Sequence, residues 1–300
     1  MKRALVFLVF LTAMLGICSA AWAATINVGP AEAFTTIQAA IDAAVAGDVI
    51  NVAVGEYHGY IDINKRVSII GAGSGSDPLT STIIYNGTQP YDSKYGIIQL
   101  NASGLDSDSP ILLQDMRVMT VDRAGISVGL FYQTTGTNVS YITFDNIQVW
   151  GNNANAPTEQ ERGFYVDNTS NASHLVFTNC QFNNLTYGWY FQKQVSIDTS
   201  SVSYLTATNC TFNHNNHKGV YAEKLDHALF TNCTADWNGY DASVLPTYFY
   251  DWCAGFDINL KAGTYADIEF NGCLITNNAI GGSKEGVGIT VKGRSDGGTY

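Results

Sequence analysis

The stretch that decides the fold runs from His174 to Asn184, reads HLVFTNCQFNN, and recurs with small changes along the chain. The recurrences are YITFDNIQVWGNN from Tyr141, YLTATNCTFNHNN from Tyr204, HALFTNCTADWN from His227 and DIEFNGCLITNN from Asp267, with a weaker copy, PILLQDMRVMT, from Pro110. Self-similar units of this length indicate a repeat architecture in which each unit packs on the next.

The spacing of the units separates a constant part from a variable one. The position of the cysteine recurs, at intervals of 33, 30, 23 and 40 residues, as Ile147, Cys180, Cys210, Cys233 and Cys273. After a variable loop each unit resumes with a glycine and a second alternating strand, at Gly125, Gly163, Gly188, Gly219, Gly255 and Gly288. Fixed strands joined by a loop of changing length are therefore predicted.

Each unit predicts three short strands. In the first strand, apolar residues such as Leu175 and Phe177 point inward by period-two alternation. A bend at Asn179 and its equivalents Asn146, Asn209 and Asn232 reverses the alternation, so that the cysteine position also points inward. Asparagine tolerates the tight backbone of a bend, and its side chains can form a hydrogen-bonded ladder. The pattern predicts an all-β fold, a right-handed parallel β-helix with three short strands per turn.

The N-terminal segment is typical of a secretory signal peptide. Lys2 and Arg3 precede an apolar run from Ala4 to Cys18, and the small-residue pattern Ala21-Trp22-Ala23 follows. We expect a signal peptide over 1–23 and a parallel β-helix domain over 24–300. Since the sequence stops within a turn, at VKGRSDGGTY, we expect the domain to be incomplete at its C-terminus. The protein is expected to be secreted: extracellular, at the cell surface or periplasmic.

One helix is predicted, before the repeats. Apolar residues from Phe34 to Val45 fall at helical spacing, with Thr35 or Thr36 placed to cap the start and Gly47 to end it. The stretch FTTIQAAIDAAVAGDVINVAVGEYHGYIDINKRVSIIGAG, from Phe34 to Gly73, resembles the capping helix and first turns of the pectate-lyase-like right-handed parallel β-helix superfamily. The asparagine bend is similar to that group's asparagine ladder. The superfamily includes lyases, glycosidases, esterases, epimerases and non-enzymatic surface proteins, so the resemblance implies the fold and leaves the activity open.

The composition of the chain limits the classes of partner that the protein is expected to bind. The chain has 300 residues, 46% apolar and 14% charged, which excludes a disordered protein, and its net charge is −11. Nucleic acid and anionic membranes both need a basic surface, so neither is expected as a partner. No apolar run reaches the roughly 20 residues of a membrane-spanning helix. We expect a monomer whose partner is a polysaccharide.

The cysteines are predicted to be a stacked apolar ladder. Five remain after the signal peptide, an odd number, and four of them share one inward position. Their Cβ vectors point the same way from turn to turn, which is poor geometry for a disulfide. A metal site is disfavoured because no CxxC or matching histidine pair accompanies them.

The resemblance implies a site on the outer face of the strand after the variable loop. Tyrosines there, beside carboxylates and amides, predict a trough for a sugar chain, because sugar ring faces stack on aromatics and hydroxyls need polar partners. A long aromatic loop, 236–254, adjoins it. The alternative is structural, since outward tyrosine columns stack well in any β-helix. The predicted substrate-binding residues are Tyr165, Asp167, Tyr190, Gln192, Tyr221, Asn259 and Trp237.

Two chemistries compete for this trough. A glycoside hydrolase needs two carboxylates, and Glu223 and Asp257 are the candidates, on adjacent turns with Cα atoms about 8 Å apart. A polysaccharide lyase needs a base, for which Lys224, Lys261 and Lys292 are candidates. It also needs a cation beside the uronate carboxylate, and Asp236, Asp241 and Asp251 could bind Ca²⁺, the one cofactor considered. The alternative is a non-catalytic cell-surface or adhesion-type β-helix.

Overall fold

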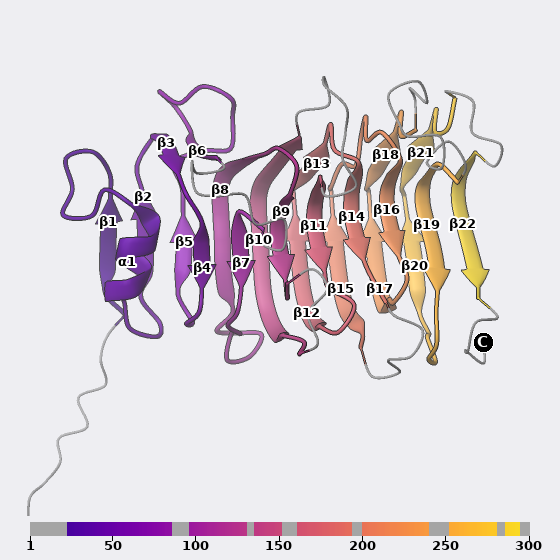
Figure 1. Cartoon of the computed structure of the whole chain (residues 1–300), viewed down its shortest axis with the longest axis horizontal. Coiled ribbons are helices and arrows are strands. Elements are labelled where there is room, and N and C mark those ends of the chain that lie inside the picture. Colours follow the sequence, from indigo (N-terminus) through magenta and orange to yellow (C-terminus); the bar gives the residue numbers. More distant parts are fainter. Residues whose placement is uncertain are drawn as a thin grey trace, which may run out of the picture.

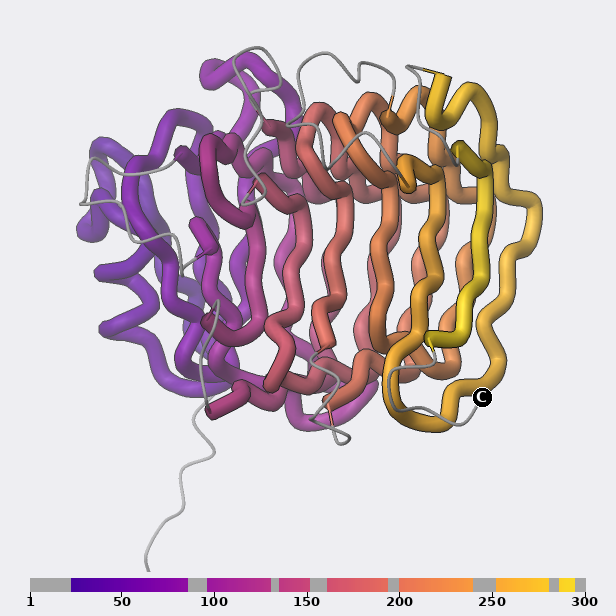
Figure 2. Tube along the Cα trace, turned by 45° about the vertical axis from the view of Figure 1, so that its right-hand side comes forward, coloured from indigo at the N-terminus to yellow at the C-terminus, as the bar shows by residue number. Residues whose placement is uncertain are grey.

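The computed structural model describes residues 23–85, 96–130, 135–151, 161–193, 200–239, 252–280 and 286–294. Over these ranges the chain is a right-handed parallel β-helix, as predicted: strands follow one another in sequence order along the long axis (Figure 1), and the tube coils turn upon turn from the N-terminal to the C-terminal end (Figure 2). The signal peptide prediction concerns residues that lie almost wholly outside the described ranges.

The larger of the sheets contains the first strand of every turn. Its 12 strands comprise the path β1-β2-β5-β8-β10-β12-β15-β17-β20, with β3, β6 and β13 joined at its side. Their bounds are β1 Thr25–Val28, β2 Val49–Val52, β3 Gly55–His58, β5 Ser68–Ile70, β6 Thr82–Tyr85, β8 Ile111–Thr120, β10 Asn138–Gly151, β12 Asn171–Thr178, β13 Gln181–Asn183, β15 Val202–Thr208, β17 Asp226–Thr231 and β20 Ile268–Asn271.

The second sheet contains the strand that follows each glycine. Its order is β22-β19-β16-β14-β11-β9-β7-β4. The bounds are β4 Ile61–Ile63, β7 Ile98–Leu100, β9 Ala124–Val128, β11 Arg162–Val166, β14 Tyr187–Phe191, β16 Lys218–Ala222, β19 Ala254–Leu260 and β22 Val287–Gly293. A third sheet pairs β18 (Thr234–Asp236) with β21 (Leu274–Thr276).

Like residues stack inward between the sheets, which confirms the predicted columns. The register pairs Phe144 with Phe177, and their rings stack with centroids 4.4 Å apart. Leu175 and Phe177 are fully buried. Because each apolar side chain packs on its counterpart in the next turn, the core runs without interruption along the axis.

The predicted bend is present, and its backbone is left-handed, with φ of 52–54° at Asn146, Asn179, Asn209 and Asn232. One hydrogen bond of the expected ladder is present, from Asn209 Nδ2 to Asn179 Oδ1 at 3.2 Å. The deeper ladder lies elsewhere and was not predicted. In it Asn215 Nδ2 donates to Asn238 Oδ1 at 2.9 Å, and Asn238 Nδ2 donates to Asn278 Oδ1 at 2.8 Å. Each amide also bonds a backbone carbonyl, so the ladder clamps the start of the variable loop.

The cysteine ladder is confirmed. Cys180, Cys210, Cys233 and Cys273 are free, and the first three are fully buried. Each thiol donates to a carbonyl of the preceding turn, as Cys233 Sγ does to Ala207 O at 3.4 Å. Burial raises the pKa of Cys273, which keeps the thiol protonated.

The glycine at the second position of β9, β11, β14, β16 and β19 is required because a neighbouring turn comes too close for a Cβ atom. A Cβ on Gly188 would lie 2.3 Å from the carbonyl oxygen of Gly219 in the next turn. The register pairs Arg162 with Tyr187 and Phe164 with Trp189 and passes over the glycines between them. Strict alternation is therefore broken at the glycine, and this decides which side chains face outward.

Helix α1 is shorter than predicted. It spans Ile37–Ala43, with Thr36 as its N-cap, and its chain turns extended at Ala44. The predicted cap is confirmed at Thr36, and Phe34 lies before it, partly buried against the core. The predicted end at Gly47 is wrong, because the helix stops at Ala43 and Val45 is 57% exposed. Residues near a helix end are the least determined by periodicity.

Candidate functional site

The outer face of the second sheet carries a polar and aromatic band that we call the belt. It comprises Arg162, Tyr165, Asp167, Tyr187, Tyr190, Gln192, Lys193, Lys218, Tyr221, Glu223, Lys224, Asp257, Asn259, Lys261 and Lys292. β11, β14, β16 and β19, with the residues that follow them, supply most of it. The structure thus brings together all predicted belt residues except Trp237.

Four belt residues are not among the predicted site residues. Arg162, Tyr187 and Lys218 each lie directly before the glycine of their strand, and Lys193 follows β14. Since alternation breaks at the glycine, the first three share the outer face with the tyrosines. The guanidinium of Arg162 lies 4.3 Å from the ring centre of Tyr165, and Lys218 Nζ lies 3.7 Å from that of Tyr221. For Arg162 and Lys218, the sequence signal that could have predicted an outward position is a charged residue at the start of an otherwise apolar strand.

The two predicted carboxylates are each paired with a lysine. Lys218 Nζ lies 2.6 Å from Asp257 Oδ2, and Lys292 Nζ is 3.6 Å from Asp257 Oδ1. Lys261 Nζ lies 2.5 Å from Glu223 Oε1. Glu223 and Asp257 are therefore held in two separate ion pairs.

Tyrosines connect these pairs. Tyr221 OH donates to Glu223 Oε1 at 2.8 Å and accepts from Asn259 Nδ2 at 3.0 Å. Farther toward the N-terminus, Tyr165 OH contacts Gln192 Oε1 at 2.5 Å. The rings of Tyr190 and Tyr221 stack with centroids 4.8 Å apart. The belt is a continuous network over at least three turns.

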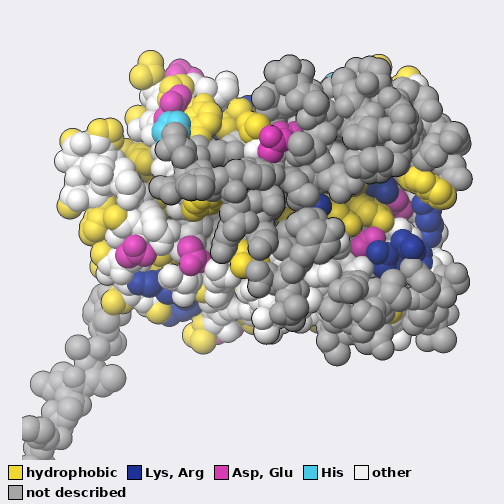
Figure 3. All heavy atoms as spheres, viewed as in Figure 1, with side chains coloured by type: hydrophobic (Ala, Val, Ile, Leu, Met, Phe, Trp, Pro, Cys, Tyr) yellow, Lys and Arg dark blue, Asp and Glu magenta, His cyan; other side chains and the backbone are white. Residues whose placement is uncertain are grey.

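The belt is more buried than an open trough would be. Tyr165, Asp167, Glu223 and Asp257 are at most 2% exposed, whereas the prediction placed them on an accessible face. The alternation pattern predicts that a side chain points outward from its strand, but it does not predict which segments cover that face. The burial of these four side chains could therefore not be predicted from the sequence. The side chain of Lys292, 33% exposed, is the most accessible end of the ion pairs. On the face drawn in Figure 3, Lys and Arg side chains gather toward the C-terminal end beside acidic ones.

Burial changes the acid–base properties of the belt. Desolvation lowers the pKa of Lys218, against the attraction of Asp257, and raises the pKa of Tyr165 and Tyr190. Clusters of buried, perturbed ionisable groups are typical of functional sites.

Lys224, a predicted base, is hydrogen-bonded to a turn of the backbone. Its Nζ donates to the carbonyls of Asp167 and Ser170, each at 2.6 Å, and its side chain is fully buried. Desolvation lowers the pKa of Lys224 to about 7.

The lowered pKa of Lys224 predicts that the free energy of unfolding depends on pH. Between about pH 7 and about pH 10.4 the unfolded chain binds a proton that folded Lys224 does not, so stability should rise with pH in this window. Lys224→Met should lose that increment, measured as urea midpoints across the window. Lys65→Met is the matched control, because Lys65 Nζ also bonds two carbonyls, those of Asp42 and Ala44, but is half-buried. Equal slopes in wild type and Lys224→Met would contradict the assignment.

The remaining predicted residues lie apart from the belt. Trp237 is 39% exposed at a corner after β18, and its ring is nearly parallel to that of His214. Asp236 Oδ1 accepts from Thr276 Oγ1 and Asn277 Nδ2. Asp241 and Asp251 lie outside the described residues. Within the described ranges no group of three or more His, Cys, Asp or Glu side chains could hold a metal ion.

Fold and belt define the class of this chain as a right-handed parallel β-helix protein. No family model matches it, and no curated protein matches it. Pectin methylesterase from Aspergillus niger, in deglycosylated form, aligns at 14% identity and a TM-score of 0.37 over 91% of this chain and 83% of that chain, and its penultimately deglycosylated form gives the same values. Geobacillus virus E2 ORF18 aligns at 14% identity and a TM-score of 0.31, over 79% of this chain and 55% of that chain.

These similarities are similarities of fold and carry nothing about activity. The resemblance to the pectate-lyase-like group extends no further than the β-helix. In the described part of the chain, no helix is long and apolar enough to cross a membrane.

Proposed function

We propose that this protein is a secreted β-helix protein that binds and processes a polysaccharide carrying acidic groups, with the belt as its site. One observation carries the proposal. The chain has a net charge of −11, yet the belt holds six basic side chains, of which burial lowers the pKa of Lys218 and Lys224, against three carboxylates. A local excess of positive charge on an acidic protein favours an anionic ligand.

The tyrosines support a sugar ligand. Tyr190 and Tyr221 are half-buried and stacked, beside the cations Arg162 and Lys218. Aromatic rings with adjacent polar groups suit a pyranose, which has an apolar face and a rim of hydroxyls. Trp252, 47% exposed with Lys292 Nζ at 4.6 Å from its ring, extends this surface.

The reaction class divides between two sets of residues. A lyase requires a base that is partly neutral near pH 7, and burial moves the pKa of Lys218 in that direction. Lys261 and Lys292 would then pair with the uronate carboxylate. A hydrolase would use Glu223 and Asp257, after the ligand displaces Lys261 from Glu223 and both Lys218 and Lys292 from Asp257.

The test is a panel of polygalacturonate, alginate and neutral glucan, each with and without Ca²⁺. Binding, new reducing ends and the ultraviolet absorbance of an unsaturated product are measured together. We expect an acidic glycan to bind and to be cleaved. Unsaturated product identifies a lyase, and reducing ends without it identify a hydrolase. Binding without cleavage would support the non-catalytic alternative.

Variants locate the activity. Lys261→Ala and Lys292→Ala, at the accessible end of the belt, should each weaken binding of the acidic glycan by about tenfold, the loss of one charge-assisted contact. His58→Ala, on a stacked pair with Tyr85 outside the belt, is the control and should bind as wild type does. Lack of binding to every acidic glycan, or equal binding by the lysine variants, would overturn the proposal.

A further inference from the structure

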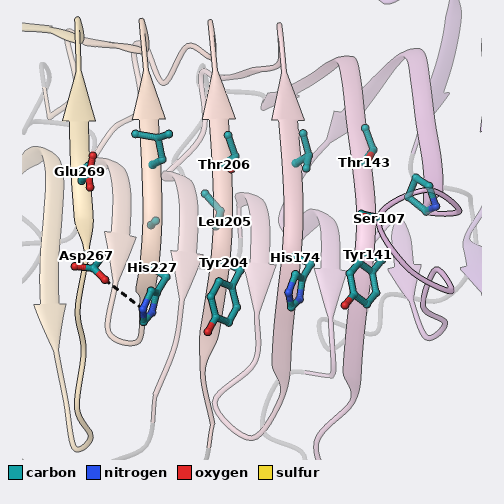
Figure 4. Close-up of a pocket in the computed structure, with 14 residues that line it drawn as sticks. Ser107, Tyr141, Thr143, His174, Tyr204, Leu205, Thr206, His227, Asp267 and Glu269 are labelled. Atoms are coloured by element: carbon teal, nitrogen blue, oxygen red, sulfur yellow. Dashed lines mark ion pairs between the residues drawn. The ribbon is translucent and has the colours of Figure 1, made fainter.

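A second surface lies on the outer face of the larger sheet. A cavity of about 440 Å³ runs across β10, β12, β15, β17 and β20, as Figure 4 shows. One ring per turn lines it, from Tyr141, His174, Tyr204 and His227. A second row, two residues farther along each strand, contains Thr143, Val176, Thr206, Leu229 and Glu269. We call this surface the groove.

The rings of the groove form a continuous stack. Successive centroids are 4.5 Å apart from Tyr141 to His174, 4.8 Å from His174 to Tyr204 and 4.9 Å from Tyr204 to His227. Tyr204 is the most open of them, at 51% exposure. Any ligand that runs along the axis therefore meets one aromatic edge, with its hydroxyl or ring nitrogen, at every turn.

The two tyrosines of the groove occupy backbone positions that do not suit them. Tyr141 and Tyr204 have φ angles of 56° and 54°, in the left-handed region where bulky residues are outliers, while histidine, at His174 and His227, is among the residues enriched there. At the next bend of the same turns, with nearly the same φ, the chain uses asparagine, as at Asn179 and Asn209. The fold can thus fill such a position without strain, and it retains tyrosine at two of the groove positions instead. Strain that recurs at one surface is typical of functional sites.

Charge and hydrogen bonding narrow the ligand. Asp267 and Glu269 line the groove and are exposed, and none of the described residues that line it is Lys or Arg. His227 lies between two carboxylates, with Nδ1 2.8 Å from Asp226 Oδ2 and Nε2 3.3 Å from Asp267 Oδ2. An acidic ligand would be repelled here. Of the strands below, β10, β12, β15 and β17 are paired on both sides, whereas β20 is the last strand of its sheet in the described ranges. A ligand that crosses the first four strands therefore meets side chains alone.

We propose that the groove is a second glycan site, which takes a neutral oligosaccharide lying across the strands. Tyrosine and threonine hydroxyls, histidine nitrogens and the two carboxylates bond its hydroxyls, and Val176 and Leu229 contact its apolar faces. A peptide is less suited, because it would need backbone partners that the paired strands do not offer. The groove is independent of the belt, which faces the other way and carries the opposite charge.

The test is calorimetric titration of the full chain with cello-, chito- and manno-oligosaccharides, and with oligogalacturonate and a lysine-rich peptide for comparison. We expect a neutral oligosaccharide to bind. Tyr204→Asn should weaken it by about tenfold or more, through loss of the central ring. The same variant should unfold at an equal or higher temperature, because asparagine accepts the left-handed backbone. Loss of binding without loss of stability separates a ligand role from a structural one.

Three results would overturn the proposal. They are the absence of binding by all three neutral oligosaccharides, equal or tighter binding of the oligogalacturonate or the peptide, and wild-type affinity in Tyr204→Asn. Lys261→Ala and Lys292→Ala should leave groove binding unchanged, so failure of the belt and failure of the groove can be told apart. His58→Asn, on a stacked pair outside the groove, is the control.

Discussion

Asn238→Ala is expected to lower the free energy of unfolding by about 3–5 kcal/mol, since each polar group left unsatisfied in the interior costs about 1–3 kcal/mol. Asn238 is fully buried. Its Oδ1 accepts from the backbone N and from Nδ2 of Asn215, and its Nδ2 donates to Phe212 O at 2.7 Å and to Asn278 Oδ1. Alanine leaves the Asn215 donors and the Phe212 carbonyl without these partners. Urea denaturation, with the midpoint and the slope fitted separately, measures the loss.

The matched control comes from the outer asparagine column. Asn209 is exposed and has a left-handed backbone, so Asn209→Gly removes one amide from a ladder while keeping the conformation accessible. We expect it to cost less than about 1 kcal/mol, in the range of an exposed hydrogen bond. If both variants lose the same amount, the inner ladder has no special role in holding the turns together.

Lys218→Met is expected to destabilise the protein by about 3–5 kcal/mol, because it leaves a buried carboxylate without its main partner. Asp257 is 1% exposed, and Lys292, 3.6 Å away and partly in solvent, replaces only part of the lost attraction. In contrast, Lys218→Met/Asp257→Leu removes both charges and should recover most of the stability, as replacement of buried ion pairs by apolar residues often does.

A double-mutant cycle over these variants measures the coupling. The double variant also tests the role of this ion pair in binding. If it is stable but no longer binds acidic glycan, the pair of Lys218 and Asp257 contributes to binding separately from its role in folding. Equal stability of Lys218→Met and wild type would show that the ion pair contributes little to the folded state.

The repeat in the sequence was enough to predict the strands, the inward columns and the asparagine bends, because those features recur in every turn. Phe177 points inward for the same reason that Phe144 does. Features that break the repeat were harder to predict from the sequence. Lys218 was assigned to no face, because the close approach at the following glycine interrupts the alternation on which the prediction depended.

The aligned units contain the residues of the groove but do not identify it as a site. Tyr141, His174, Tyr204 and His227 stand at the same position of successive repeats, at the start of each unit. The left-handed backbone of these four residues could not be predicted from the sequence, because the residues that normally indicate this conformation are asparagine and glycine. The burial of the belt could not be predicted either, since what covers a strand depends on segments distant in the chain.

The buried charges affect how copies of this protein meet. Of its 15 basic residues, six are buried in the described ranges, against five of its 26 acidic residues. In the described part of the chain, the solvent-facing surface is therefore proportionally more acidic than the residues as a whole. Copies approaching one another in dilute buffer should repel, which keeps concentrated solutions dispersed, and salt at about 0.1 M should weaken that repulsion beyond about 10 Å.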